Sequence, residues 1–287
     1  MEQAFLLFLG AAAAVSIFVT VGIVATLIGD GAGFFTDVSF VDFLFGTTWE
    51  PVAGKYGVLP LLSASLTIAG IATIVAVPLG VGSAIYLSEY APEKVRRTLK
   101  PVLEVLAGMP TIVLGFFAIQ SVTPALQRLL PFEIAFFNML SAGIVVGVLI
   151  MPLISSLSED AMRAVPNSLR EGAYGVGATR RVVSVKIILP AALSGVVASI
   201  VLAVSRAVGE TMAVSLAAGN QANLSLNVFS GAQTVTGYIV QVAKGEASRG
   251  SLQYKSIFAL GLMLFVVTFA INLLALRLVR RYRTAYQ

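Results

Sequence analysis

The chain has 287 residues, of which 57% are hydrophobic and only 11% are charged, whereas a soluble domain carries about 25% charged residues. The apolar residues fall into runs of about 20 residues, the length that spans the hydrocarbon core of a bilayer. The net charge of +5 is typical of a membrane protein whose cytoplasmic loops collect Lys and Arg, so it does not indicate nucleic acid binding. The sequence contains neither Cys nor His, which excludes disulfides and thiolate metal sites and disfavours an enzyme. We therefore expect an all-α polytopic membrane protein with no metal site.

Six apolar segments are long enough to cross the membrane. The first is too long for the apolar region of a cleavable signal peptide, and no basic residue precedes it, so we interpret it as a span. The third is interrupted by Gly108 and Pro110, which predicts a kinked or broken helix. The six predicted spans cover residues 5–28, 61–87, 101–121, 135–157, 191–218 and 256–279.

The distribution of basic residues predicts the orientation. With the N-terminus in the cytoplasm, thirteen of the 19 Lys and Arg residues fall on the cytoplasmic side and five fall outside. The remaining one, Arg206, lies inside the fifth span. Because cytoplasmic loops collect Lys and Arg, this asymmetry predicts that both termini are cytoplasmic. The long external segment 219–255 is expected to dip back towards the bilayer or to form short helices.

Small residues in the fourth span predict close helix packing. Gly143 and Gly147 form a G-x-x-x-G pattern, which allows another helix to approach closely.

The longest cytoplasmic segment, 158–190, has the pattern of two helices joined by a glycine turn. Ser158 is a plausible first N-cap, and a second helix start follows at Pro166. The first helical stretch is expected to end in the glycines before Ala178, and Pro190 is expected to end the second. We therefore predict a compact, partly apolar surface element that docks onto another protein.

Part of this segment resembles a phosphate-binding loop but lacks what such a loop needs. The stretch from Gly172 to Thr179 reads G-x-x-x-x-G-A-T, with Ala178 in place of the lysine that contacts the phosphates. No predicted strand precedes it. ATP binding is therefore assigned to a separate subunit.

The same segment resembles the cytoplasmic signature of the permease subunits of bacterial ABC importers, written E-A-A, three residues, G, nine residues, I-x-L-P. The matching positions, with Gly172 in place of the first alanine, are Glu171, Gly172, Ala173, Gly177, Ile187, Leu189 and Pro190. The resemblance implies six transmembrane helices in the type I importer architecture, in the bacterial cytoplasmic (inner) membrane. It also implies that a coupling helix near 168–190 binds the ATPase. Two copies of that ATPase would hold ATP and Mg, and this chain would need no cofactor.

On this resemblance the chain is expected to have three parts. The parts are a first span with its external loop at 1–60, an importer core at 61–280 and a cytoplasmic tail at 281–287.

Four further stretches resemble a narrower family, the PstC-type permeases of phosphate importers. They read "TTWEPVAGKYGVLPLLSASLTIA", "YLSEYAP", "LAGMPTIVLGFF" and "SRAVGETMAV". The resemblance implies transport of inorganic phosphate, a homologous PstA-type permease as partner and an extracytoplasmic phosphate-binding protein. Alternatives are a PstA-type subunit, a permease for another oxyanion such as sulfate or molybdate, and a secondary transporter or channel acting alone.

Two charges inside the fifth span are the candidate substrate site. Arg206 and Glu210 are four residues apart, so we expect them to lie on one face of the helix, where they can neutralise each other. The structural interpretation is an ion pair that serves helix packing. The functional interpretation uses the planar guanidinium, which matches the oxygens of phosphate, with Glu210 holding it in place and limiting its attraction. The PstC-type resemblance likewise implies that this pair lies in the phosphate path.

Overall fold

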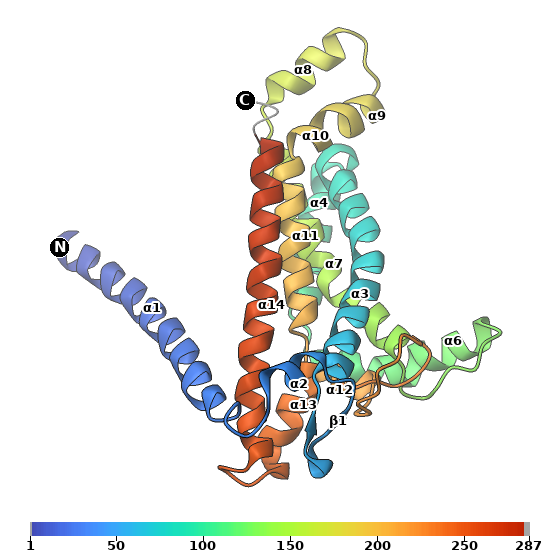
Figure 1. Cartoon of the computed structure of the whole chain (residues 1–287). Coiled ribbons are helices and arrows are strands. Elements are labelled where there is room, and N and C mark those ends of the chain that lie inside the picture. Colours follow the sequence, from blue (N-terminus) through green and yellow to red (C-terminus); the bar gives the residue numbers. More distant parts are fainter. Residues whose placement is uncertain (1, 284–287) are drawn as a thin grey trace. The chain divides into compact units, whose positions relative to one another are not determined.

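The computed structural model describes residues 2–283 and is helical, apart from one short β ribbon (Figure 1). The chain divides into two compact units. The first contains the residues up to Leu59 together with Tyr238–Val267, and the second contains Pro60–Gly237 together with the residues from Thr268 onwards. Two helices, α13 (Val235–Gln241) and α14 (Leu252–Arg283), run from one unit into the other.

The first unit contains one long helix and a small aromatic core. Its remaining elements, besides its parts of α13 and α14, are α1 (Glu2–Ala32), α2 (Phe40–Phe45), β1 (Trp49–Glu50), η1 (Pro51–Ala53), β2 (Lys55–Tyr56) and η5 (Val242–Glu246). Trp49 and Tyr56 lie opposite each other in the antiparallel ribbon. Both are buried, and the Trp49 ring packs edge-to-face on Tyr56 at 5.5 Å and on Tyr238 at 4.9 Å. These packed aromatic rings form a small hydrophobic core for the short segment that contains the β ribbon.

The second unit carries the helices around the candidate site. In chain order these are α3 (Leu59–Ile85), η2 (Tyr86–Tyr90), α4 (Glu93–Ala107), α5 (Thr111–Phe117), η3 (Ala118–Val122), α6 (Thr123–Leu129), α7 (Met139–Arg163), α8 (Asn167–Gly175), α9 (Arg180–Val182), η4 (Val183–Ile188), α10 (Leu189–Ala191), α11 (Leu193–Val208) and α12 (Met212–Ala217). Helix α7 is the most buried of the long apolar helices.

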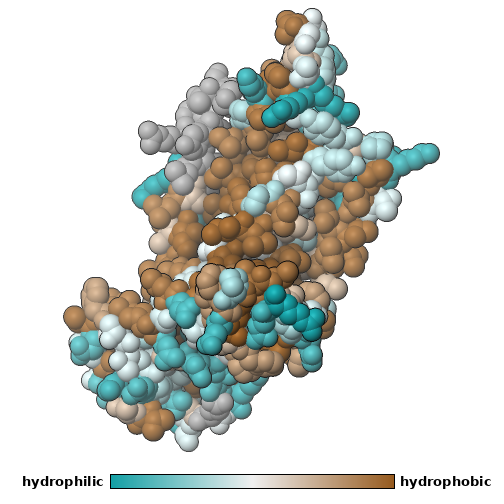
Figure 2. Space-filling model, turned by 90° about the vertical axis from the view of Figure 1, so that its right-hand side faces the viewer, coloured by the Kyte–Doolittle hydropathy of each residue, from teal (hydrophilic) through white to brown (hydrophobic). Residues whose placement is uncertain are grey.

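The prediction of six membrane spans compares with five or six in the described residues. Five helices are long and apolar enough to cross a membrane, and the count is six when the bent pair Arg180–Ala191 and Leu193–Val208 is taken as one span. The five cover Phe5–Ala32, Leu59–Tyr90, Thr111–Leu129, Met139–Arg163 and Leu252–Ala275. Hydrophobic side chains cover much of the face of the molecule shown in Figure 2, as expected for helices that contact lipid.

The predicted bounds of the third span, 101–121, are wrong. The segment breaks completely after Ala107, and the apolar helix begins only at Thr111. Helix α4 is instead a separate amphipathic helix, because one of its faces carries Arg96 and Lys100. A glycine and a proline in one short turn end one helix and start the next.

The predicted start of a helix at Ser158 is also wrong. Helix α7 continues through this position to Arg163, and the Ser158 hydroxyl lies 2.7 Å from that of Ser199 on α11. The second predicted start is confirmed, because α8 begins at Asn167 directly after Pro166. Pro190 lies within α10, one residue before its end.

The predicted close packing of the fourth span is confirmed. A Cβ built on Gly143 would lie 2.6 Å from Cβ of Ile71, and one built on Gly147 would lie 2.9 Å from the carbonyl oxygen of Ala72. Both neighbours belong to α3, so glycine is what allows α7 to approach that helix.

Candidate functional site

Two broken helices lie side by side in the second unit. Helix α11 ends at Val208 and α12 begins at Met212, while α4 ends at Ala107 and α5 begins at Thr111. Helices α5 and α12 are in close contact, because a Cβ built on Gly115 would lie 2.9 Å from Cβ of Leu216. In many secondary transporters, discontinuous helices form the substrate site.

Arg206 connects these two breaks. It lies in the last turn of α11, and its Nη2 donates to the carbonyl oxygen of Ala107 at 3.4 Å, where α4 ends. Among the described residues, this long hydrogen bond is the one polar contact of the Arg206 side chain. The side chain is otherwise exposed. The guanidinium therefore has further donors available for an anion.

The prediction that Arg206 and Glu210 share one helical face is wrong. The fifth span is not one helix from 191 to 218, and Glu210 lies in the break between α11 and α12. Across the described residues no ion pair joins the two side chains. Gly209 caps the end of α11, so the helix stops before Glu210. Glu210 therefore does not lie one helical turn after Arg206 on the same face.

Glu210 stabilises the break. Its side chain is buried, at 9% exposure, and its Oε1 accepts a hydrogen bond from the backbone N–H of Ala213 at 3.3 Å. Its carbonyl oxygen accepts from the hydroxyl of Thr236 at 2.8 Å. The carboxylate thus satisfies an N–H in the first turn of α12, a position where negative charge is favourable.

The segment after α12 folds back against the same break. The prediction of short helices in 219–255 is confirmed by α13 and η5. Thr234 and Thr236 are buried, and the backbone N–H of Val235 donates to the Ser65 hydroxyl of α3 at 3.1 Å. The hydroxyls of Ser65 and Thr236 therefore hold this returning segment against α3 and the break.

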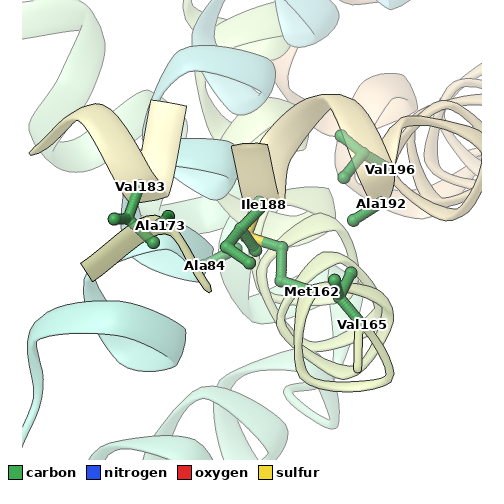
Figure 3. Close-up of a cluster of buried hydrophobic side chains, with 8 residues drawn as sticks. All are labelled: Ala84, Met162, Val165, Ala173, Val183, Ile188, Ala192 and Val196. Carbon is green, nitrogen blue, oxygen red and sulfur yellow. The ribbon is translucent and has the colours of Figure 1, made fainter. Parts of the chain in front are cut away.

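The signature residues of 168–190 form one cytoplasmic element (Figure 1). Ala173 is buried in an apolar cluster with Val183 and Ile188, and Ile187 and Leu189 pack against that cluster (Figure 3). Pro190 is half-buried nearby. The signature therefore brings together residues of α8, η4 and α10 that are far apart in the motif.

The remaining signature residues face outwards. Glu171 and Gly172 are exposed, and Gly177 has a φ of +82°, which favours glycine in the turn after α8. Apolar side chains accompany them on the surface, with Tyr174 45% exposed and Val176 86% exposed. Exposed apolar residues on a short polar element are typical of a surface that binds another protein.

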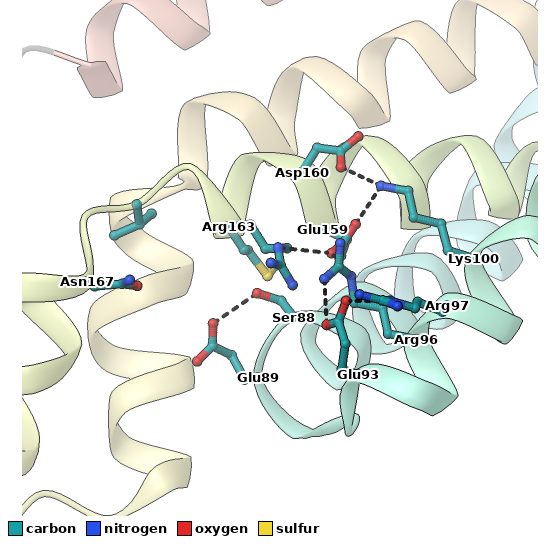
Figure 4. A network of polar contacts seen from close by, with 12 residues as sticks. Ser88, Glu89, Glu93, Arg96, Arg97, Lys100, Glu159, Asp160, Arg163 and Asn167 are labelled. Atoms are coloured by element: carbon teal, nitrogen blue, oxygen red, sulfur yellow. Dashed lines mark hydrogen bonds and ion pairs between the residues drawn. The ribbon is translucent and has the colours of Figure 1, made fainter.

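A buried carboxylate was missed by sequence reasoning. Glu159 of α7 is fully buried and lies 2.7 Å from Nζ of Lys100 and 3.0 Å from Nε of Arg96, both on α4 (Figure 4). The Arg96 N–H does not point at the carboxylate, so this contact is an ion pair and not a hydrogen bond. Burial by itself lowers the pKa of Lys100. Hydrogen bonds to Asp160 and Glu159 raise this pKa, and the effects that raise it outweigh burial, so the pKa lies above its usual value.

The cluster extends along the surface of α4. Hydrogen bonding to Arg97 holds the pKa of the exposed Glu93 carboxyl below its usual value, and the charge of Arg96 acts in the same direction. The available sequence signal for this cluster was "EKVRRTLK", in which one acidic residue is followed by four basic residues.

The fold and the site together are those of a permease of the ABC importer class, with several long apolar helices, two adjacent helix breaks and a separate element formed by α8 to α10. Residues 76–284 match the family described as the binding-protein-dependent transport system inner membrane component. The chain belongs to this family and is therefore a multi-pass inner-membrane subunit that works with an ATPase and a binding protein. It holds no cofactor, since ATP is bound by the ATPase partner.

Several curated relatives are similar over most of the chain. The phosphate transport system permease PstC of Mesorhizobium japonicum is 33% identical over 282 residues, covering 92% of this chain and 86% of that protein. YqgH of Bacillus subtilis (strain 168), a probable ABC transporter permease, is 34% identical over 271 residues, covering 94% and 85%. PstC of Xylella fastidiosa (strain 9a5c) is 35% identical over 264 residues, covering 84% and 80%. The resemblance drawn from the sequence motifs is thereby confirmed.

Solved structures show the same fold. A bacterial alginate ABC transporter, in complex with a periplasmic protein bound to alginate pentasaccharide, matches with a TM-score of 0.67 at 16% identity, covering 98% of this chain and 96% of that chain. An inward-facing structure of the MetNI methionine transporter matches with a TM-score of 0.62 at 18% identity, covering 82% and 99%.

Proposed function

We propose that this chain is the PstC-type permease subunit of an ATP-driven phosphate importer. The observation that carries the proposal is the exposed guanidinium of Arg206 between two helix breaks, in a chain similar to PstC permeases over most of its length. A homologous PstA-type permease would complete the path, two ATPase copies would drive it, and an extracytoplasmic phosphate-binding protein would deliver the ion.

Arg206 provides the attraction for the anion. A guanidinium is charged at every physiological pH, and its planar fork matches two phosphate oxygens. The single long contact to Ala107 anchors one arm of the side chain and leaves other donors for phosphate. Transport also requires release, so a site with one fixed cation suits the task better than a cluster of cations.

Glu210 acts on the backbone of the path. Since its carboxylate accepts from the Ala213 N–H, it fixes the start of α12 beside the break. It also places a negative charge on the path, which limits how strongly phosphate is retained.

The cytoplasmic element is the proposed contact with the ATPase. The exposed Glu171, the positive φ of Gly177 and the exposed side chains of Tyr174 and Val176 give α8 a polar and apolar surface suited to a cleft in another protein. Ile187 and Leu189 pack against the apolar cluster that joins Ala173 of α8 to Ala84 of α3, and so they help to attach α8 to the membrane helices.

The experiment is phosphate uptake by proteoliposomes containing the whole complex. Arg206→Gln should abolish uptake while the complex still assembles, and Arg206→Lys should restore little, because an ammonium lacks the planar fork. Glu210→Gln keeps an oxygen acceptor for Ala213, so it isolates the effect of charge. Arg128→Gln, at an external arginine, is the matched control and should transport normally.

The double variant Arg206→Gln with Glu210→Gln tests whether the cation itself is needed. It should remain inactive, because no guanidinium is left to attract the anion, and uptake by this double variant would refute the proposal. Competition by sulfate or molybdate at concentrations equal to phosphate tests the substrate, and inhibition by either one would favour the other-oxyanion alternative.

A further inference from the structure

Arg170 of α8 joins three helical elements through one guanidinium. Its Nη2 lies 3.0 Å from Oε1 of Glu89 in η2, and the same nitrogen donates to the carbonyl oxygen of Met162 near the end of α7 at 2.8 Å. Its Nη1 donates to the carbonyl oxygen of Val165 at 2.7 Å and to Oδ1 of Asn167 at 3.3 Å. We call this arrangement the Arg170 junction.

The junction is shielded from water. The side chain of Glu89 is 5% exposed and that of Arg170 is 17% exposed. Glu89 also accepts a hydrogen bond from the Ser88 hydroxyl at 2.9 Å (Figure 4). A guanidinium with four acceptors in a fixed fork is held in one orientation, so the three elements cannot shift independently without breaking charge-assisted hydrogen bonds.

A second set of contacts holds the same end of α3. The guanidinium of Arg180 in α9 lies 5.0 Å from the ring centre of Tyr90 in η2, which is a favourable cation–π distance. Ala84 of α3 lies in the apolar cluster with Ala173 of α8 and Ile188 (Figure 3). The cytoplasmic end of α3 is therefore held by both halves of the signature element.

Stability alone does not account for a buried ion pair at this point. Well-packed apolar residues of similar volume often stabilise a fold as much as a buried pair does, because burying two charges costs desolvation energy. The Ala84 cluster already supplies such packing. What the ion pair adds is directionality, since it fixes α8 against η2 and α7 along defined hydrogen bonds.

We propose that Arg170 and Glu89 are positioning residues that make α8, η2 and the end of α7 move as one body, so that movement of the ATPase is transmitted to α3 and α7. The inference rests on the proposed function, in which α8 binds the ATPase. Neither residue contacts the substrate or the nucleotide. Their effect would be on the phosphate transported per ATP hydrolysed.

The first experiment measures coupling in proteoliposomes that contain the complete importer. Arg170→Gln and Glu89→Gln should retain the ATPase subunit and its hydrolysis, while the phosphate transported per ATP falls several-fold below wild type. The matched control is Arg97→Gln, which removes an arginine that is 78% exposed and lies outside the element, and its coupling should equal wild type.

The double variant Arg170→Gln with Glu89→Gln tests whether the pair acts as a unit. It should be as uncoupled as either single variant, because all three lack the directional contact. Full recovery of coupling in the double variant would show that the pair only balances charge, and the proposal would be overturned. Parallel loss of hydrolysis and uptake in the single variants, or unchanged coupling in them, would overturn it as well.

The second experiment does not depend on the substrate. Because the chain contains no Cys, spin labels can be placed at Ser83→Cys on α3 and Ser168→Cys on α8. The distance between them should stay constant when the complex binds ATP, and it should change with ATP in the Arg170→Gln background. A wild-type distance that itself changes with ATP would refute the junction. Absence of phosphate uptake in wild type would refute only the proposed function.

Discussion

The buried carboxylate of Glu159 gives the sharpest test of how α4 is attached to α7. Glu159→Gln keeps the shape of the side chain and removes its charge. Three basic groups surround the carboxylate, with Nζ of Lys100 at 2.7 Å, Nε of Arg96 at 3.0 Å and Nε of Arg163 at 3.7 Å. The substitution therefore leaves several cations beside a neutral amide, and it should destabilise the α4–α7 contact.

The magnitude follows from the exposure of the partners. Removing one member of a fully buried pair costs about 3–5 kcal/mol. Here the side chains of Arg96 and Lys100 remain 20% and 22% exposed, and Lys100 keeps its contact with Asp160. Water and Asp160 offset part of the loss, so we expect the free energy of unfolding to fall by about 2–3 kcal/mol.

The assay is equilibrium unfolding of the purified chain in detergent micelles, followed by far-UV circular dichroism. Glu104→Gln is the matched control, because Glu104 is an exposed carboxylate on α4 and its removal should change stability by less than about 0.5 kcal/mol. If Glu159→Gln unfolds at the same denaturant concentration as this control, the carboxylate does not hold the two helices together.

The pH dependence of the same contact has a defined sign. The pKa of Lys100 in the folded chain lies above 10.5, so its contribution is fully present below that pH and is lost only as the pH rises through the folded value. The loss caused by Glu159→Gln should therefore be constant between about pH 6 and pH 9, since Lys and Arg stay charged there. A loss that varies across this range would contradict the assignment of Lys100 as a charged partner.

Three further predictions concern packing, the coupling turn and topology. Gly147→Ala should lower the free energy of unfolding by about 1–3 kcal/mol in the same micelle assay, because its Cβ would collide with the Ala72 carbonyl; an unchanged value would show that α3 and α7 separate freely. Gly177→Leu should reduce retention of the ATPase in pull-down experiments, because its φ of +82° disfavours an L-residue although its Cβ position is open, and normal retention with normal uptake would contradict the docking role. A cysteine at Ser248 should react with an impermeant thiol reagent in cells without an outer barrier while one at Ser168 should not, and the reverse pattern would invert the topology.

The sequence alone determined the class of protein, most of its apolar spans and the helix that begins after Pro166. Hydropathy is a local property, and a backbone in lipid must satisfy its own hydrogen bonds, so a run of about 20 apolar residues has few alternatives to a helix. The spacing between Glu171 and Pro190 is likewise local, and it placed α8 and its glycine turn correctly. Arg206 was identified because a charge within an apolar run is rare enough to stand out.

Only the tertiary structure decided where helices stop and which charges are buried. The break at Glu210 depends on contacts with Thr236 and Ala213 that no helical periodicity predicts, so the expected pair with Arg206 did not form. Arg170 and Glu89 are 81 residues apart in the chain, and nothing in the sequence pairs them. A carboxylate is tolerated out of water only when folding brings a cation to it, and that meeting depends on how α8, η2 and α7 pack, which local sequence does not record.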